Sequence, residues 1–153
     1  MKRRVFLQGS LAAGTLGVAA LTGLLTPISA LAAWPKEAFQ AKELSEAMKK
    51  LLGTDATEEN KKIRIDAPDV AEDGSLVRVK VYADLPNVDS ITLFSPKNPI
   101  PLIASFRLTP GVKGFISTKI KMADTGDVVA VAKAGDKLYS ARRQVKVTVG
   151  GCK

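Results

Sequence analysis

The carboxyl end of the chain carries its only cysteine. Cys152 follows two glycines, Gly150 and Gly151, and precedes the final residue, Lys153. A thiol in its thiolate form is a nucleophile and a redox-active group, and consecutive glycines free the backbone from side-chain restrictions. The pattern therefore predicts a flexible tail, residues 150–153, that carries one reactive thiol into the clefts of other proteins.

Two lysines lie close to this cysteine in the sequence. Lys153 is adjacent to it, and Lys146 lies six residues before it. Positive charge favours the thiolate over the thiol and attracts anions, although the terminal carboxylate partly offsets the effect and salt screens it. We therefore expect Lys153 and Lys146 to help an anion approach the thiol.

The chain contains no histidine. This absence removes the usual general base, the histidine ligands of zinc and blue-copper sites, and every Ser-His or Cys-His nucleophilic pair. One cysteine also excludes an internal disulfide. We therefore expect neither an autonomous hydrolase nor a metalloenzyme, and a copper electron carrier is nearly excluded.

The amino terminus has the features of an export signal. Lys2, Arg3 and Arg4 precede a long uncharged apolar stretch that ends in the cleavage pattern Ala30-Leu31-Ala32. The paired arginines and the glycine-rich apolar stretch are typical of the twin-arginine route. We expect residues 1–32 to be a cleaved signal and the protein to be periplasmic and free of the membrane afterwards. A retained membrane anchor is the alternative.

Residues 33–149 have the length of one domain with its own core. Without the signal, the chain keeps 20 basic and 15 acidic residues, so its net charge falls from +8 to +5. Aromatic residues are few, and this moderate charge does not predict nucleic-acid binding. Small anions or an acidic partner surface fit the charge better.

Hydrophobic periodicity predicts one helix and then strands. Apolar residues at helical spacing indicate a helix from Pro35 to Leu52 that stops at Gly53. The following polar stretch indicates a loop, and seven strands are predicted at 62–66, 76–83, 90–94, 102–108, 114–122, 128–132 and 137–149. This order predicts an all-β, immunoglobulin-like antiparallel β-sandwich of about seven strands with a short N-terminal helix and a flexible C-terminal tail.

The strand at 128–132, "VVAVA", differs from its neighbours. The strands at 76–83 and 137–149 alternate apolar and polar residues, which is typical of one dry and one wet face. The sequence VVAVA does not alternate, which indicates cover on both faces. Two interpretations stay open: a central strand with small residues turned outward, or a subunit interface on that sheet.

Several segments resemble one known family. The stretches "NPIPLIASFRLTP" (98–110) and "ISTKIKMADTGDVVAVAKAGDKLYSARRQVKVTVGGC" (116–152) resemble SoxY, the sulfur-carrier subunit of the thiosulfate-oxidising Sox system. The resemblance covers essentially residues 33–153, and the twin-arginine signal agrees with it. It implies an immunoglobulin-like protein that pairs with a SoxZ-like subunit and holds inorganic sulfur intermediates covalently on Cys152, with Gly150 and Gly151 as the arm.

The resemblance also implies that this chain is not itself an enzyme and has no catalytic residue, no metal and no cofactor, because the chemistry lies in transient enzyme partners. SoxAX conjugates thiosulfate to the thiol oxidatively, SoxB releases the terminal sulfone as sulfate, and SoxCD-like enzymes oxidise the remaining sulfur. The family tail usually continues beyond the cysteine with two glycines, whereas here Lys153 follows. We expect this lysine to change how the tail fits partner clefts. The rival hypothesis is a non-carrier immunoglobulin-like binding module whose cysteine serves only intermolecular disulfides.

Overall fold

The computed structural model of the chain describes residues 35–151, so the predicted signal at 1–32, Cys152 and Lys153 lie outside the described residues. The described part contains a 3-10 helix, an α-helix and nine strands. Their bounds are η1 (Ala38–Gln40), α2 (Leu44–Leu52), β1 (Glu58–Glu59), β2 (Ile63–Asp66), β3 (Val70–Asp73), β4 (Val77–Ala83), β5 (Val88–Phe94), β6 (Leu102–Arg107), β7 (Gly114–Ile120), β8 (Gly126–Ala134) and β9 (Lys137–Val149). All seven predicted strands are present.

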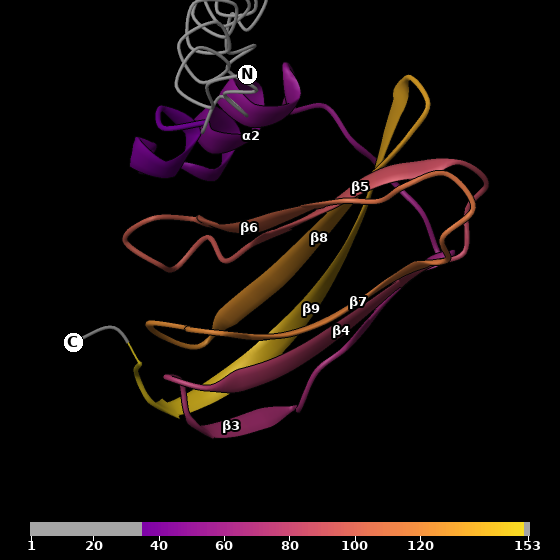
Figure 1. The fold of residues 1–153 in the computed structure, drawn as a ribbon. Helices are drawn as coiled ribbons and strands as arrows, with labels where there is room; N and C mark the ends of the chain where they lie inside the picture. The colour runs from indigo at the N-terminus through magenta and orange to yellow at the C-terminus, as the bar shows by residue number, and fades with distance from the viewer. Residues whose placement is uncertain (1–34, 152–153) are drawn as a thin grey trace, which may run out of the picture. The chain divides into compact units, whose positions relative to one another are not determined.

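Two sheets face each other, and the helices cover the outside of one of them (Figure 1). The larger sheet has the strand order β1-β9-β8-β5-β6, with β3 also paired to β9, and the smaller sheet has the order β2-β4-β7. Between them lies a core of Ile, Leu, Val and Ala side chains. The molecule is therefore the predicted β-sandwich. None of the helices in residues 35–151 is long and apolar enough to cross a membrane.

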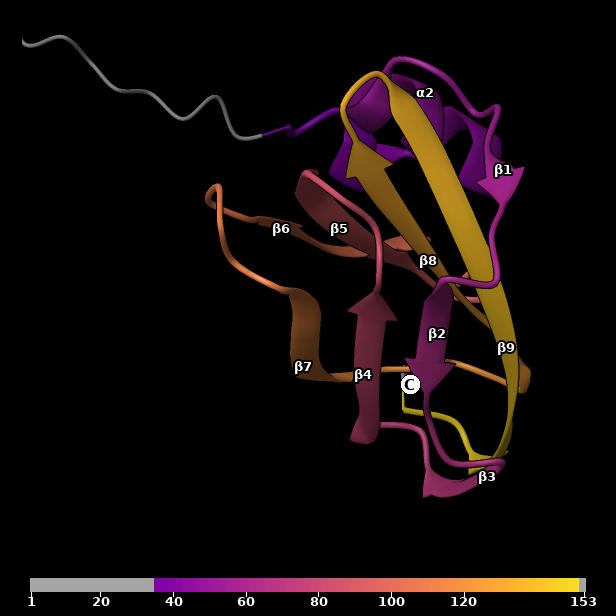
Figure 2. The same ribbon diagram turned by 90° about the vertical axis from the view of Figure 1, so that its right-hand side faces the viewer.

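Two strand pairings were not predicted. β1 and β3 are short, and each runs parallel to β9, whereas only antiparallel strands were predicted. β3 pairs with the part of β9 that extends beyond its partner β8 (Figure 2), where β9 would otherwise expose unpaired backbone groups. A turn follows β3 and begins at Gly74.

The predicted helix from Pro35 to Leu52 is wrong in its first half. The helical turn of η1 ends before Ala41, which is extended (φ −62°, ψ 139°), and α2 starts at Leu44. Ala41 is 2% exposed and packs in the same cluster as Met48 and Val131. Packing against the sheet thus favours a bend that local periodicity does not indicate. The stop at Gly53 is confirmed by its φ of 84° and by its N–H, which donates to the carbonyl oxygen of Lys49.

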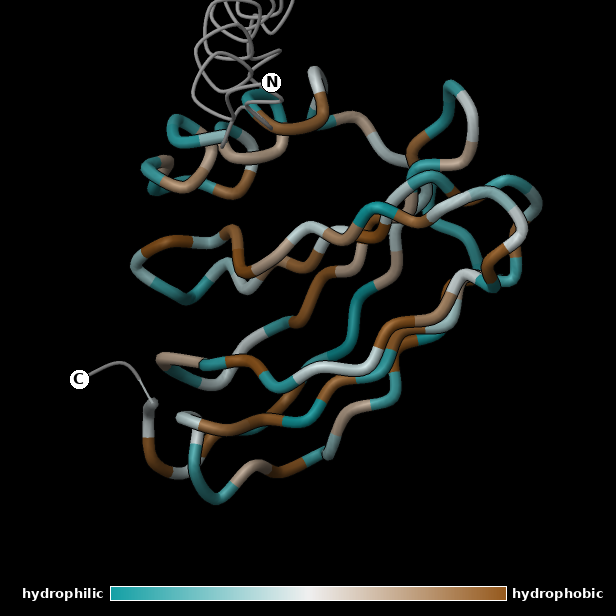
Figure 3. Tube along the Cα trace, viewed as in Figure 1, coloured by the Kyte–Doolittle hydropathy of each residue, from teal (hydrophilic) through white to brown (hydrophobic). Residues whose placement is uncertain are grey.

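The VVAVA strand is covered on both faces by this chain itself. In β8, Val128 and Ala130 face the core between the sheets, whereas Val129 and Val131 pack against Met48 and the other apolar residues of the helical segment. Figure 3 shows that both the helical segment and the strands contain apolar stretches along the chain. The alternative of a subunit interface at Val129 and Val131 is therefore wrong, because their side chains are already buried.

Candidate functional site

The tail begins where β9 leaves the centre of the large sheet. β8 pairs with β9 only as far as Val145. Beyond it, the backbone N–H of Val147 donates to the hydroxyl oxygen of Thr125 at 2.9 Å, and β3 lies on the other side in parallel register. The last strand is thus held on both sides up to Val147 and by β3 up to Val149, which fixes where the tail starts.

Three backbone hydrogen bonds link the tail to two loops. The N–H of Gly74 donates to the carbonyl oxygen of Val149 at 2.7 Å, and the N–H of Met122 donates to the carbonyl oxygen of Gly74 at 2.8 Å. The N–H of Gly151 in turn donates to the carbonyl oxygen of Met122 at 2.9 Å. The end of β9, the turn after β3 and the loop after β7 therefore form one connected structure, which we call the tail base.

Glycine is required at the tail base by close packing. A Cβ atom on Gly150 would meet the carbonyl oxygen of Ala123, and one on Gly151 would meet the backbone of Gly74 and the N–H of Ser75. These neighbours are backbone atoms, which cannot rotate out of the way as a side chain can. Gly150 and Gly151 were predicted to serve flexibility, and the structure shows close approach as a separate reason for glycine at both positions.

Asn98 holds the loop on which the tail rests. Its side-chain NH2 donates to the carbonyl oxygen of Lys121 at 2.8 Å, and its side-chain oxygen accepts the N–H of Ala123 at 2.8 Å. These two bonds flank Met122, whose carbonyl oxygen accepts the Gly151 N–H. Asn98 therefore positions the Met122 carbonyl oxygen, which accepts the hydrogen bond from the tail, although Asn98 lies more than fifty residues before Gly151 in the sequence.

Asp73 closes the turn on the other side of the tail base. Its carboxylate accepts the backbone N–H of Ser75 and the Ser75 hydroxyl, each at 2.7 Å. These two bonds, the backbone one first, lower the pKa of Asp73 below its ordinary value. The charged form of Asp73 thus stabilises the turn that contains Gly74.

The predicted site residues are only partly brought together. Lys146 is exposed on β9, and its backbone N–H donates to the carbonyl oxygen of Asp69 at 2.9 Å. Lys121, which the sequence analysis did not identify, is exposed beside the loop that receives the tail. Cys152 and Lys153 lie outside the described residues. Sequence reasoning also missed Gly74, Asn98 and Met122, and only an Asp-Gly pair at 73–74 signalled a turn there.

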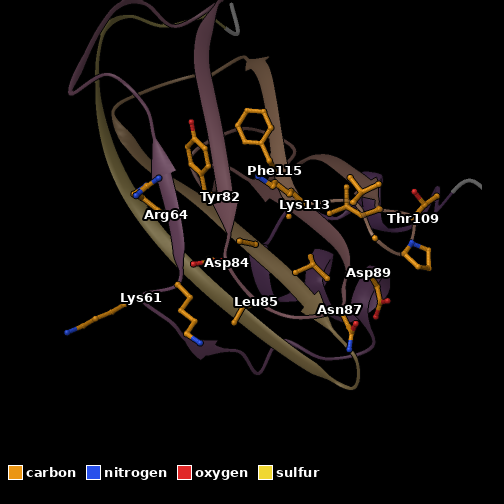
Figure 4. Close-up of a pocket in the computed structure, with 18 residues that line it drawn as sticks. Lys61, Arg64, Tyr82, Asp84, Leu85, Asn87, Asp89, Thr109, Lys113 and Phe115 are labelled. Carbon is orange, nitrogen blue, oxygen red and sulfur yellow. The ribbon is translucent and has the colours of Figure 1, made fainter.

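A separate groove of about 1230 Å³ lies at the opposite end of the sandwich, between the β4–β5 and β6–β7 loops. Figure 4 shows Arg64, Tyr82 and Phe115 side by side at this groove. Within residues 35–151 no three His, Cys, Asp or Glu side chains are grouped so that they could hold a metal ion. The groove and the tail base are thus two distinct features of the surface.

Comparisons with known proteins agree with this arrangement. A family model described as "Sulfur oxidation protein SoxY" matches residues 48–152. The solved structure of the sulfur carrier protein SoxY from Chlorobium limicola f thiosulfatophilum is similar with a TM-score of 0.65 and 39% sequence identity, over 75% of this chain and 100% of that one. No curated protein matches. The family match extends over the sandwich, the tail base and the terminal cysteine, and the chain therefore belongs to the SoxY family.

Proposed function

We propose that this chain is a periplasmic sulfur carrier that holds intermediates of thiosulfate oxidation covalently on Cys152. The observation that carries the proposal is the position of the tail base. β9 ends at Val149 and Gly151 lies at the end of the sandwich, directly before the only cysteine in the sequence. Membership of a family that includes a sulfur carrier protein supports the same role.

The carrier chemistry needs the thiolate and an external oxidant. The Cys152 thiolate and the outer sulfur of thiosulfate form a disulfide-type bond, and two electrons leave to a c-type cytochrome partner of SoxAX type. Water then cleaves the terminal sulfone as sulfate and two protons in a SoxB-type enzyme, which leaves a persulfide on the cysteine. The chain itself supplies the attachment atom and its presentation, and the enzymes supply the redox and hydrolytic steps.

Delivery requires the tail to leave the tail base. Gly151 is held there by one hydrogen bond, from its N–H to the Met122 carbonyl oxygen. Such a bond contributes about 1 kcal/mol net, so its rupture changes the population of the released tail by a factor of about five. The tail in this proposal exchanges between a docked position and a released one, and Gly150 and Gly151 serve both: close packing when docked and free rotation when released.

Intact mass measurement tests the proposal. Protein from the periplasm of thiosulfate-fed cells should carry sulfur or sulfonate adducts that reductant removes, and the Cys152→Ser protein, which keeps the tail length, should carry none. A wild-type protein that remains unmodified, or forms only a reductant-sensitive dimer, would contradict the carrier role and favour a binding module linked by disulfides. Replacement of both Arg3 and Arg4 by Lys tests the export route, because the twin-arginine route requires the arginine pair.

A further inference from the structure

The outer face of the small sheet carries an excess of positive charge. In β2 and β4 every second residue is buried in the core, and in β7 Ile116 and Ile120 are buried, so the alternate residues of the three strands share one outward face. We call this surface the basic face. It consists of Arg64, Asp66, Arg78, Lys80, Tyr82, Phe115, Ser117 and Lys119. Four of these side chains are cations and one is an anion.

Cross-strand register arranges these side chains in three rows. In the first row, the Arg64 guanidinium lies 4.7 Å from the centre of the Tyr82 ring, and the Tyr82 and Phe115 ring centres are 4.9 Å apart. In the second row, the Lys80 ammonium lies 3.4 Å from the Asp66 carboxylate. These two rows are therefore stabilised by contacts within the sheet.

The third row consists of two cations, Arg78 and Lys119, in direct register. Directly opposite residues of antiparallel strands lie about 5 Å apart at Cβ, and like charges at this spacing destabilise a sheet. β2 ends at Asp66 and adds no residue to this row. Among residues 35–151, neither Arg78 nor Lys119 forms an ion pair. An anionic group from outside the chain that bound between Arg78 and Lys119 would reduce this repulsion.

The first row borders the groove. Lys61, Lys62 and Lys113 also line it, so cations surround its mouth, and Val112 and Phe115 expose apolar surface there, at 54% and 43%. Figure 4 shows Phe115 and Tyr82 beside each other with Lys113 close by, and Asp84 also lines the groove. Aromatic and arginine side chains beside exposed apolar surface are the composition of binding hot spots in protein interfaces.

We propose that the basic face and the groove together bind an acidic segment of a partner protein. Carboxylates of the segment would pair with Arg78 and Lys119, and one of its apolar side chains would enter the groove against Val112 and Phe115. The three rows extend about 13 Å along the sheet, which is the length of a few residues of extended chain. The groove lies at the opposite end of the sandwich from the tail base, and the proposed binding does not depend on sulfur loading.

A peptide segment fits this surface better than a nucleic acid does. The carboxylates of Asp84 and Asp89 also line the groove. These carboxylates would repel a nucleic acid, because its backbone carries a negative charge at every nucleotide. A peptide instead presents backbone N–H groups, and these can donate hydrogen bonds to the carboxylates. The mixed charge of the groove therefore favours a partner in which acidic side chains alternate with N–H donors and apolar groups.

Fluorescence titration of the full chain with a synthetic peptide tests the proposal. The probe is a labelled peptide of about twelve residues, rich in Asp and Glu with one Phe, which spans about 40 Å when extended. Lys119→Glu should weaken binding about tenfold at low ionic strength. Lys137→Glu, which makes the same charge change at the exposed start of β9, should change it less than twofold. A peptide with Asn and Gln in place of the acids should not bind.

Two further measurements make the test decisive. Lys119→Glu should raise the urea midpoint of unfolding, because it replaces a repulsive pair with an attractive one, so stability and binding should change in opposite directions. Equal loss of binding in Lys119→Glu and Lys137→Glu would overturn the proposal, since net charge alone would explain it. Tighter binding of a single-stranded oligonucleotide than of the acidic peptide would overturn the choice of a protein partner. If the urea midpoint of Lys119→Glu is unchanged or lower than that of the wild type, Arg78 and Lys119 do not repel each other as proposed.

Discussion

The amide N–H of Gly151 donates a hydrogen bond of 2.9 Å to the carbonyl oxygen of Met122. This contact joins the last described residue of the tail to a loop that Asn98 holds from the other side. The point from which Cys152 continues is therefore set by contacts among segments that are distant in the sequence. Each of these contacts can be altered separately.

Substitution of Gly151 by Ala should release the tail from the tail base. The new Cβ would meet the backbone of Gly74 and Ser75, so the hydrogen bond to Met122 should be lost at a cost of about 1 kcal/mol. Hydrogen exchange of the amide at position 151, measured by NMR, should become faster by about fivefold or more. The control is Thr148→Ala, at an exposed position of β9, which should leave the exchange rate of the amide at position 151 unchanged. Equal protection of this amide in Gly151→Ala and in the wild type would contradict the close packing.

Substitution of Asn98 by Ala should loosen the loop that receives the tail. It removes three side-chain hydrogen bonds, one donated to Lys121 and two accepted from Ala123 and Ser95, and should lower the free energy of unfolding by about 1–3 kcal/mol. Asn98→Asp keeps an acceptor for Ala123 but places a carboxylate against the Lys121 carbonyl oxygen, so it should not restore stability. Urea denaturation measures both variants. If Asn98→Asp is as stable as the wild type, the hydrogen bond to the Lys121 carbonyl oxygen does not contribute to stability.

Stability should depend on pH through Asp73. Its pKa is lower in the folded protein than its ordinary value of 3.8, so the charged form stabilises the fold. This contribution is present above the unfolded-state pKa and is lost as the pH falls below 3.8 through the folded-state pKa. The urea midpoint of Asp73→Asn should therefore fall less than that of the wild type between about pH 5 and about pH 2. Parallel curves for the two proteins would contradict this role for Asp73.

Substitution of Val131 by Asp should unfold or strongly destabilise the protein. Val131 is 1% exposed between the large sheet and α2, where an unpaired carboxylate loses its hydration, and we expect a loss of about 3 kcal/mol or more. Val70→Asp makes the same change at a valine that is 53% exposed and should cost less than about 1 kcal/mol. Thermal or urea unfolding measures both. If the two variants are equally stable, the helical segment does not cover β8.

Charge reversal at Lys153 and Lys146 should slow the reaction of Cys152 with anions. Both lysines are close to the thiol in the sequence, and Lys146 is exposed on β9. In Lys146→Glu/Lys153→Glu the rate with iodoacetate, an anion, should fall by about threefold or more at low salt, and the rate with neutral iodoacetamide should fall less. High salt should remove most of the difference between the reagents. If the two reaction rates fall equally, the lysines change only the fraction of Cys152 in the thiolate form, and the prediction that they attract the anion is contradicted.

Most of the fold could be predicted from the sequence, because local patterns report local burial. Alternation in Val77–Ala83 and Lys137–Val149 follows from the two faces of a strand, and the lack of alternation at 128–132 reports cover on both faces. The cysteine behind two glycines could also be predicted to form a reactive tail, since thiol chemistry depends on residue type and chain position.

Other features arise only in the tertiary structure. The parallel pairing of β3 with β9, the bend at Ala41 and the cover of Val131 by the helical segment depend on contacts between segments far apart in the sequence. The bonds from Asn98 to the loop at 121–123 and the close approach of Gly151 to Gly74 likewise have no local signal. The sequence alone determined the strands and the thiol, because these follow from short-range periodicity and residue chemistry. Only the tertiary structure decided what holds the tail and which cations share one face, because both depend on the register of strands that long loops separate.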